Sequence, residues 1–322
     1  MSRRRRTGRK ILKALLPITM LFVLALVCLA GWLAYSATHP PQRAYLVTPD
    51  KFVMLSNRGL KVTEESWQNR DGTRARGWLL RGAEGAPAVV MLHRYAADRS
   101  WLLNLGVKIN EAANFTVLWP DLRGHGQSPP VASSSLGTRE AEDVLAALDY
   151  LRTLKSPQNR PLVVAARVGL YGVELGAYAA LVAATRDAGA RALVLDSVPA
   201  SPDDLLRATV RRHTGFENDL VQLLARAASR VYFMGDYENL RACAAASSLS
   251  DRRVLLLAGT DADHLRDSTT ALAACFPTPS DVELKNDLPL TGFTLASATG
   301  QQGEAYDRRV IEFFDRTLQT AP

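Results

Sequence analysis

One short segment near the middle of the chain constrains the fold more than any other. Residues 168–176 read VGLYGVELG, an apolar run that predicts a buried strand and ends in a turn with two glycines, Gly172 and Gly176. The next residues, Ala177–Ala184, are small and apolar, as in a tightly packed helix. A strand, a sharp turn and a helix in this order present the central residue, Glu174, at the carboxyl end of a strand. The segment therefore predicts an α/β fold built around this turn.

Apolar and amphipathic segments alternate along most of the remaining chain, which predicts strands alternating with helices. The first two strands flank Asp71-Gly72, a dipeptide typical of hairpin turns, so we expect them to be antiparallel. The other strands are expected to form a mostly parallel, twisted sheet with helices on both faces. The predicted strands are Val62–Gln68, Arg74–Arg81, Ala88–Leu92, Phe115–Trp119, Val168–Tyr171, Ala192–Leu195, Arg253–Ala258 and Val282–Leu284, and the other predicted helices are Ser100–Ala113, Arg139–Leu154 and Glu304–Leu318.

Residues 201–250 break this alternation, because they show helical spacing of apolar residues and no strand pattern. We expect them to form a helical cap over the carboxyl edge of the sheet, where ligands of open α/β sheets bind. The main domain is then expected to cover residues 62–322, with the cap as an insertion.

The positive charge of the chain is concentrated in its first 13 residues. The net charge is +7 and the pI is about 9.5. Seven basic residues and no acid lie in this tail, so the rest of the chain holds 32 basic and 32 acidic residues. A short basic tail on a neutral domain argues against nucleic-acid binding. The seven are Arg3, Arg4, Arg5, Arg6, Arg9, Lys10 and Lys13.

The tail precedes Ala14–Tyr35, an almost wholly apolar segment that predicts a transmembrane anchor. At about 1.5 Å per residue this helix spans roughly 30 Å, the thickness of a bilayer's hydrocarbon core. Trp32 and Tyr35 lie at its far end, as interfacial aromatic residues do. The positive tail predicts a cytoplasmic N-terminus in a bacterial inner membrane, with the main domain periplasmic or otherwise extracytoplasmic.

A cleaved signal peptide is the alternative to this anchor, because Ala34-Tyr35-Ser36 is a weak small-x-small cleavage site. The apolar run is longer than an ordinary signal sequence, which favours an uncleaved anchor. Residues 36–61 are then expected to form a linker, stiffened near its start by Pro40-Pro41.

The three cysteines leave their pairing open. Cys28 lies in the anchor, and Cys243 and Cys275 are either unpaired or joined by a disulfide in an oxidising compartment. No residues have metal-ligand spacing, and no motif indicates a cofactor. The membrane is the only predicted partner, and the oligomeric state and any small-molecule or protein ligand are not predicted.

Several ordered motifs carry a resemblance to one superfamily. They are Asp71-Gly72 with Gly77-Trp78, Leu92-His93, Asp121–Ser128 (DLRGHGQS), Gly137–Glu140 with Asp143, the Gly172/Gly176 turn, and Gly259 with Asp261 and Asp263. Because these motifs occur in this order, the chain resembles the α/β-hydrolases from about Val62 to the C-terminus. The resemblance is in particular to the serine-aminopeptidase and acyl-hydrolase type. The resemblance implies the fold predicted above and a nucleophile elbow at the Gly172/Gly176 turn.

The resemblance also implies a catalytic triad, two members of which are replaced. Such enzymes place a serine on the elbow, a histidine in the last loop and an acid after a late strand. Glu174 stands at the serine position, and Phe293 stands at the histidine position by its spacing from the last helix. Asp261 or Asp263 matches the acid, and no histidine follows His264.

The loop after the third strand departs from the family as well. The resemblance implies that His93, Arg94 and Tyr95, together with Leu175 after the elbow, surround the oxyanion site. The family has His-Gly where this chain has His93-Arg94, so a long cation replaces the glycine that lets the backbone bend toward the oxyanion.

Two functions follow from these substitutions. The first is a catalytically degenerate hydrolase, a pseudoenzyme that binds or scaffolds, with Glu174 held by Arg94 or by a backbone N–H at the helix start. The second is an active hydrolase of ester, amide or acyl substrates that uses Glu174 as a carboxylate nucleophile. That second function lacks a base, because Phe293 cannot accept a proton.

The remaining candidate residues are expected to be structural. His93 and His125 match structural positions of the family, and His264 is expected at the surface or at a helix start. Ser128 and Ser197 lie at strand ends, but neither lies in an elbow.

Overall fold

The structure is a computed structural model that describes residues 2–56, 59, 61–215, 218–234, 237, 240–294 and 300–319, without the side chains of residues 2–14 and 263. The chain divides into two compact units. One contains Met1–Ala37 and Leu206–Tyr237, and the other contains Thr38–Leu205 and Glu238–Pro322. Only residues 206–237 of the predicted 201–250 cap therefore lie outside the main unit.

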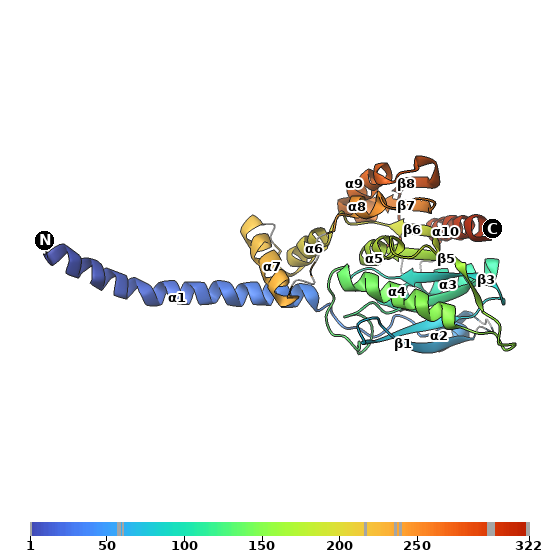
Figure 1. The fold of residues 1–322 in the computed structure, drawn as a ribbon, viewed down its shortest axis with the longest axis horizontal. Coiled ribbons are helices and arrows are strands. Elements are labelled where there is room, and N and C mark those ends of the chain that lie inside the picture. The colour runs from blue at the N-terminus through green and yellow to red at the C-terminus, as the bar shows by residue number, and fades with distance from the viewer. Residues whose placement is uncertain are drawn as a thin grey trace. The chain divides into compact units, whose positions relative to one another are not determined.

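The second unit is built on one eight-stranded sheet with the order β1-β2-β4-β3-β5-β6-β7-β8 (Figure 1). Strands β1 and β2 form the predicted antiparallel hairpin, β2 is antiparallel to β4, and the remaining neighbours are parallel. The mostly parallel sheet is thus confirmed. The strands are β1 (Val62–Gln68), β2 (Arg74–Leu80), β3 (Ala86–Leu92), β4 (Thr116–Pro120), β5 (Val163–Val173), β6 (Ala190–Asp196), β7 (Arg253–Gly259) and β8 (Val282–Leu288).

Helices cover both faces of this sheet. Helices α3 (Leu103–Ala113) and α10 (Gln301–Gln319) share one apolar core with Met91 of β3 and Tyr171 of β5. Helices α4 (Thr138–Thr153) and α5 (Leu175–Ala184) pack against each other and contact the same two strands. Because strand side chains alternate between faces, the two helix pairs bury both faces of most of β3 and of the second half of β5.

The shorter helices of this unit lie mainly in its connections. A 3-10 turn, Arg99–Leu102, replaces the start of the predicted Ser100–Ala113 helix, because Asp98 caps it by accepting a hydrogen bond from the Ser100 N–H. The others are α2 (Pro49–Ser56), α8 (Ala242–Ala246), α9 (Asp263–Leu272) and the 3-10 turns Thr260–Ala262, Ala273–Cys275 and Pro279–Asp281.

The segment predicted as the linker 36–61 is in part folded. It contains α2, and the second unit begins at Thr38. Tyr45 donates a 2.7 Å hydrogen bond to Asp121, and its ring lies edge-on to Trp78 with centroids 5.1 Å apart. These contacts bury Tyr45 partly, and they join the segment to the sheet.

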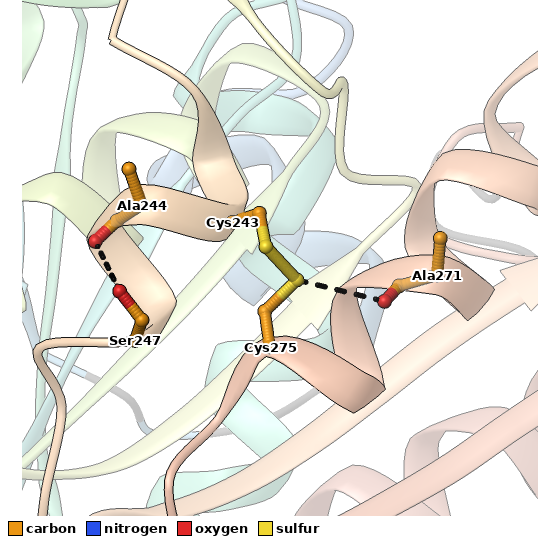
Figure 2. The surroundings of a disulfide bond; sticks show 5 residues. All are labelled: Cys243, Ala244, Ser247, Ala271 and Cys275. Carbon is orange, nitrogen blue, oxygen red and sulfur yellow. Dashed lines mark hydrogen bonds between the residues drawn. A yellow bond between two sulfur atoms is a disulfide. The ribbon is translucent and has the colours of Figure 1, made fainter.

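Cys243 of α8 and Cys275 form a disulfide (Figure 2), which resolves the alternative left open by the sequence. The two Cα atoms are 5.2 Å apart and the residues are 32 positions apart in sequence. The disulfide therefore joins α8, which follows residues 206–237 in sequence, to the 3-10 turn that follows α9.

The first unit consists of the N-terminal helix up to Ala37 and of cap residues 206–237, which hold most of α6 and all of α7. Helix α1 (Ser2–Thr38) contains the apolar segment Leu15–Thr38, which is long and apolar enough to span a membrane or to act as a signal sequence. Helices α6 (Pro202–Thr214) and α7 (Asp219–Tyr232) follow from the cap sequence, with no strand among the described residues between them.

Candidate functional site

The turn between β5 and α5 has the shape of a nucleophile elbow. Glu174 has φ 49° and ψ −107°, a conformation that costs a non-glycine residue about 1–3 kcal/mol. A Cβ atom on Gly172 would lie 2.4 Å from the Gly176 backbone, and one on Gly176 would lie 2.3 Å from the Leu92 carbonyl oxygen. Both glycines are therefore required for the close approach of β3, β5 and α5.

The Glu174 carboxylate points back toward the loop after β3. The residue is only 3% exposed, and its Oε2 accepts a 3.0 Å hydrogen bond from the backbone N–H of Tyr95. In an α/β-hydrolase elbow the oxyanion hole combines the N–H after the nucleophile with an N–H from the loop after β3. The corresponding positions in this chain are Leu175 and Tyr95, and the Glu174 carboxylate accepts from the Tyr95 N–H.

The loop after β8 brings Phe293 to the same edge of the sheet. Asp261 accepts a 2.9 Å hydrogen bond from the Thr291 N–H and further bonds from the Thr291 and Thr294 hydroxyls. A Cβ atom on Gly292 would lie 2.8 Å from Cγ2 of Val173, the residue before Glu174. Asp261 thus stabilises the loop that carries Phe293 through hydrogen bonds with Thr291 and Thr294.

Arg94 connects this loop with the loop after β3. Its guanidinium carbon lies 5.1 Å from the centroid of the Phe293 ring and 4.5 Å from that of Trp101. Its Nη1 donates a 3.2 Å hydrogen bond to the Tyr95 carbonyl oxygen. The Arg94 guanidinium therefore packs on the Phe293 and Trp101 rings as in a cation–π contact.

Two residues after β7 complete this edge. His264, at the start of α9, is exposed, and its ring lies edge-on to Phe293 with centroids 5.7 Å apart. The side chain of Asp263, the second acid candidate, lies outside the described residues. Among the described side chains, no group of three His, Cys, Asp or Glu residues is arranged to hold a metal ion.

A buried carboxylate that the sequence interpretation missed lies between these elements. Asp196, at the end of β6, accepts hydrogen bonds from the Gly292 N–H at 2.7 Å, the Ser197 hydroxyl at 2.8 Å and the Tyr306 hydroxyl. Tyr171 lies 2.8 Å from the Tyr306 hydroxyl. Complete burial raises the pKa of Asp196 to about 7, although these hydrogen bonds oppose the shift. An acid directly after an apolar strand was the available signal.

Of the two buried histidines, His93 joins the loops after β3 and β4 through its ring nitrogens. His93 Nε2 accepts a 3.1 Å hydrogen bond from the Leu122 N–H, which leaves Nδ1 to donate to the Arg94 carbonyl oxygen at 2.9 Å. Burial lowers the pKa of His93 to about 4, and burial together with the neighbouring His93 lowers that of His125 to about 3. Both rings are therefore neutral near pH 7.

The other candidate residues have structural partners. His125 lies 2.8 Å from the Arg123 carbonyl oxygen by its Nδ1. The Ser197 hydroxyl is bonded to Asp196, as described above, and the Ser128 carbonyl oxygen accepts from Arg76. Ser128 and Ser197 both have positive φ, at 52° and 54°.

Comparison with known proteins identifies the fold. No family model matches the chain. A 118-residue stretch, 36% of the chain, is 32% identical to the thiohydrolase apmlB of Arthrinium phaeospermum and covers 36% of that protein, so the chain spans about a third of its length. The Pyrococcus furiosus esterase Pf2001 is 19% identical, with a TM-score of 0.62 over 87% of this chain and 98% of its own.

A second solved structure agrees with the first. The α/β hydrolase GrgF from Penicillium sp. sh18 is 18% identical, with a TM-score of 0.55. The alignment covers 81% of this chain and 100% of the GrgF chain. The chain thus has the α/β-hydrolase fold, as the sequence predicted. These similarities concern the fold, and the chemistry must be argued from the site.

Proposed function

We propose that this chain is a membrane-anchored protein of α/β-hydrolase fold that has lost serine-type hydrolysis and acts as a binding or scaffolding module. The hydrogen bond from the Tyr95 N–H to Glu174 supports this proposal most directly. An oxyanion hole must offer its donors to a developing negative charge. Here a carboxylate that is already part of the protein accepts one of those donors.

The position of the missing base supports the same function. A serine-type or carboxylate-type nucleophile needs a group that takes and returns a proton during turnover. Phe293 is a hydrocarbon, and Arg94 packs on it rather than on a titratable ring. In this proposal the backbone keeps the shape of an α/β-hydrolase active site, while the nucleophile, the base and one donor of the oxyanion hole are replaced.

Restoring the missing groups tests this proposal. The native protein is expected to show no labelling by a fluorophosphonate probe and no turnover of p-nitrophenyl esters. A thioester belongs in the same panel, because apmlB is named a thiohydrolase. The double variant Glu174→Ser, Phe293→His is expected to gain measurable esterase activity, since it frees the Tyr95 N–H and supplies a nucleophile and a base.

Each single variant is a matched control, because it restores only one of the two groups. Native turnover that is lost in Glu174→Gln would contradict the proposal. If the double variant folds but stays inactive, the triple variant with Arg94→Gly tests whether the cation blocks the oxyanion loop. Activity of the triple variant alone would place the remaining defect at Arg94.

A hydrolase that uses Glu174 as nucleophile is the second candidate, and His264 favours it. This imidazole lies 5.7 Å, ring to ring, from the residue at the histidine position. In that function His264 would activate water against a glutamyl ester. Turnover that is lost equally in His264→Ala and Glu174→Gln would support this candidate over the first.

The membrane topology is part of the proposed function. The basic tail favours a cytoplasmic N-terminus, and the Cys243–Cys275 disulfide fits an oxidising, extracytoplasmic compartment. We expect added protease to digest the main domain in intact spheroplasts of an expressing bacterium. Protection of the domain would contradict this orientation, and an N-terminus that begins near Ser36 would show cleavage in place of an anchor.

A further inference from the structure

Helix α7 carries its apolar side chains on the outside. Leu220 and Leu223 are each 59% exposed and Val231 is 77% exposed, while Ala225 and Ser229 are buried. At 3.6 residues per turn, positions 220, 223, 227 and 231 fall on one stripe and positions 225 and 229 fall on the opposite side. Met234, just past the helix end, is 94% exposed. We call Leu220, Leu223, Ala227, Val231 and Met234 the α7 stripe.

This arrangement is the reverse of that in α10, the other strongly amphipathic helix. Val310, Phe313 and Phe314 of α10 are buried, as expected for a helix on a globular core. Among the described residues outside α1, large exposed apolar side chains occur singly at Leu46, Met54 and Leu240, whereas five belong to α7 and its C-terminal turn. Single exposed apolar residues are normal on soluble proteins, but a contiguous stripe marks an interaction surface.

The compact unit that contains α7 also contains the apolar helix α1. Side chains of α1 are mostly exposed between residues 15 and 32, and burial is confined to the last two turns, at Leu33, Ala34 and Ala37. The buried part of α1 is therefore its C-terminal end. If α1 spans a bilayer, this end lies at the outer lipid–water interface, and residues 206–237 belong to the same compact unit as α1.

The charges and aromatic residues of this unit fit a bilayer surface. Residues 206–237 contain five arginines and three acids. Arg230 lies next to the stripe and is exposed, as are Arg211 and Arg212 in the last turn of α6. Tyr232 of α7 and Trp32 of α1 are also largely exposed. Apolar stripes flanked by arginine, with tyrosine and tryptophan nearby, are typical of helices that lie in the headgroup region.

We propose that α7 lies on the outer surface of the membrane, with the α7 stripe inserted among the lipid headgroups and upper acyl chains. This inference rests on the proposed anchoring by α1 and adds a second membrane contact from a distant part of the chain. A lipid surface is favoured over a second copy of the chain because the same unit already holds a membrane-length helix. The segment 206–237 is then a membrane-contacting element.

The full-length protein in phosphatidylcholine and phosphatidylglycerol nanodiscs allows a direct test. The environment-sensitive probe NBD is attached to cysteine under non-reducing conditions, so that Cys243 and Cys275 stay joined. The native Cys28, the only free cysteine among the described residues, reports the anchor. Val231→Cys in a Cys28→Ser background reports the α7 stripe, and Glu312→Cys in the same background, exposed on α10, is the matched control.

The inference predicts three results. The Val231→Cys probe shows blue-shifted emission, loses accessibility to aqueous cobalt ions, and is quenched by lipids with a nitroxide near the headgroup. The Cys28 probe is quenched by lipids with a nitroxide deep in the acyl chain. The Glu312→Cys probe is quenched by aqueous cobalt.

Other outcomes separate the inference from the anchor. A water-accessible Val231→Cys probe beside a lipid-quenched Cys28 probe would overturn the position of α7 and leave the anchor intact. A Val231→Cys probe shielded from both quenchers would show that protein, such as a second copy, covers the stripe, which also overturns the inference. A Cys28 probe that no lipid quenches would refute the anchor itself, and the inference with it.

Discussion

The turn after β5 and the loop after β4 leave the same edge of the sheet, but their polar residues are used differently. In the loop after β4, Asp121 accepts hydrogen bonds from Tyr45 at 2.7 Å and from the Arg99 N–H at 3.0 Å. Arg123 donates to Asp143 at 2.7 Å and to Asp71 at 3.1 Å. This loop therefore connects the folded segment before β1, the β1–β2 hairpin and α4.

The turn after β5 holds Glu174 in a strained backbone conformation. The Glu174 carboxylate accepts a hydrogen bond from the Tyr95 N–H in the loop after β3. The sequence of the loop after β4 contains more groups that could catalyse a reaction, since it has an aspartate, an arginine, a histidine and a serine. Its contacts show that the aspartate, the arginine and the histidine stabilise the fold. The comparison teaches that a cluster of polar residues in the sequence does not by itself mark a site, because the contacts of this cluster stabilise the fold.

Removing Arg123 should give the largest effect on stability. Its side chain is 4% exposed, and Arg123→Ala leaves Asp143 buried without its main partner. Breaking a buried ion pair from one side costs about 3–5 kcal/mol. The free energy of unfolding, measured by tryptophan fluorescence in denaturant, should fall by that amount.

Arg139→Ala is the matched control, because Arg139 is 42% exposed and lies 3.7 Å from the same Asp71. Its loss should cost less than about 1 kcal/mol. Equal effects of the two variants would mean that the loop after β4 is not held by its buried contacts, and the comparison above would fail.

A second, smaller effect should appear in the pH dependence of the free energy of unfolding, and it arises from Asp196. The pKa of Asp196 is raised to about 7 by burial, so the folded state keeps a proton that the unfolded state releases near pH 4. Its contribution to stability is present below about pH 4 and is lost as pH rises to about 7. An asparagine at this position does not titrate, so Asp196→Asn should not lose this stability as the pH rises.

The variant should therefore gain on the native protein as pH increases. Between pH 5 and pH 8 the difference in unfolding free energy should move in favour of Asp196→Asn by about 2–3 kcal/mol. The exposed Asp267 provides the control Asp267→Asn for the loss of one charge. A pH-independent difference for Asp196→Asn would show that Asp196 is ionised in the folded protein.

Much of the fold was predictable because its signals are local. The Asp71-Gly72 turn, the apolar run before Gly172 and the spacing of α10 each depend on neighbouring residues, and the predicted strands all appear. Their ends shift by a few residues. Strand β5 starts at Val163, before the apolar run, because Val163 pairs with Ala86 of β3.

The contacts around Glu174 and Phe293 were not predictable from the sequence. The structure places Glu174 in the turn after β5 and Phe293 in the loop after β8, because motif order fixes which loop follows which strand. The Tyr95 N–H and Glu174 are 79 residues apart, and Tyr306 and Asp196 are 110 residues apart. Such pairs depend on tertiary packing, and one sequence carries no local pattern that reveals them. The Cys243–Cys275 pairing was left open for the same reason.

The smallest predicted effect isolates the strain in the turn after β5. Glu174→Gly and Glu174→Ala both remove the carboxylate that accepts from the Tyr95 N–H. The two variants therefore differ mainly in the backbone conformations that residue 174 can adopt. Glycine adopts φ 49° readily and alanine does not. After subtracting glycine's greater freedom in the unfolded chain, the glycine variant should be more stable by about 1 kcal/mol.

Glu174→Gln is the control that keeps an acceptor oxygen for the Tyr95 N–H while removing the charge. Denaturant unfolding of all three variants at one pH gives the comparison. If Glu174→Ala equals or exceeds Glu174→Gly, the turn relaxes when its side chain is removed, and the strain belongs to the Glu174–Tyr95 contact. If glycine is favoured, Gly172, Gly176 and the packing of α5 on β3 impose the elbow, and its shape does not depend on the side chain at position 174.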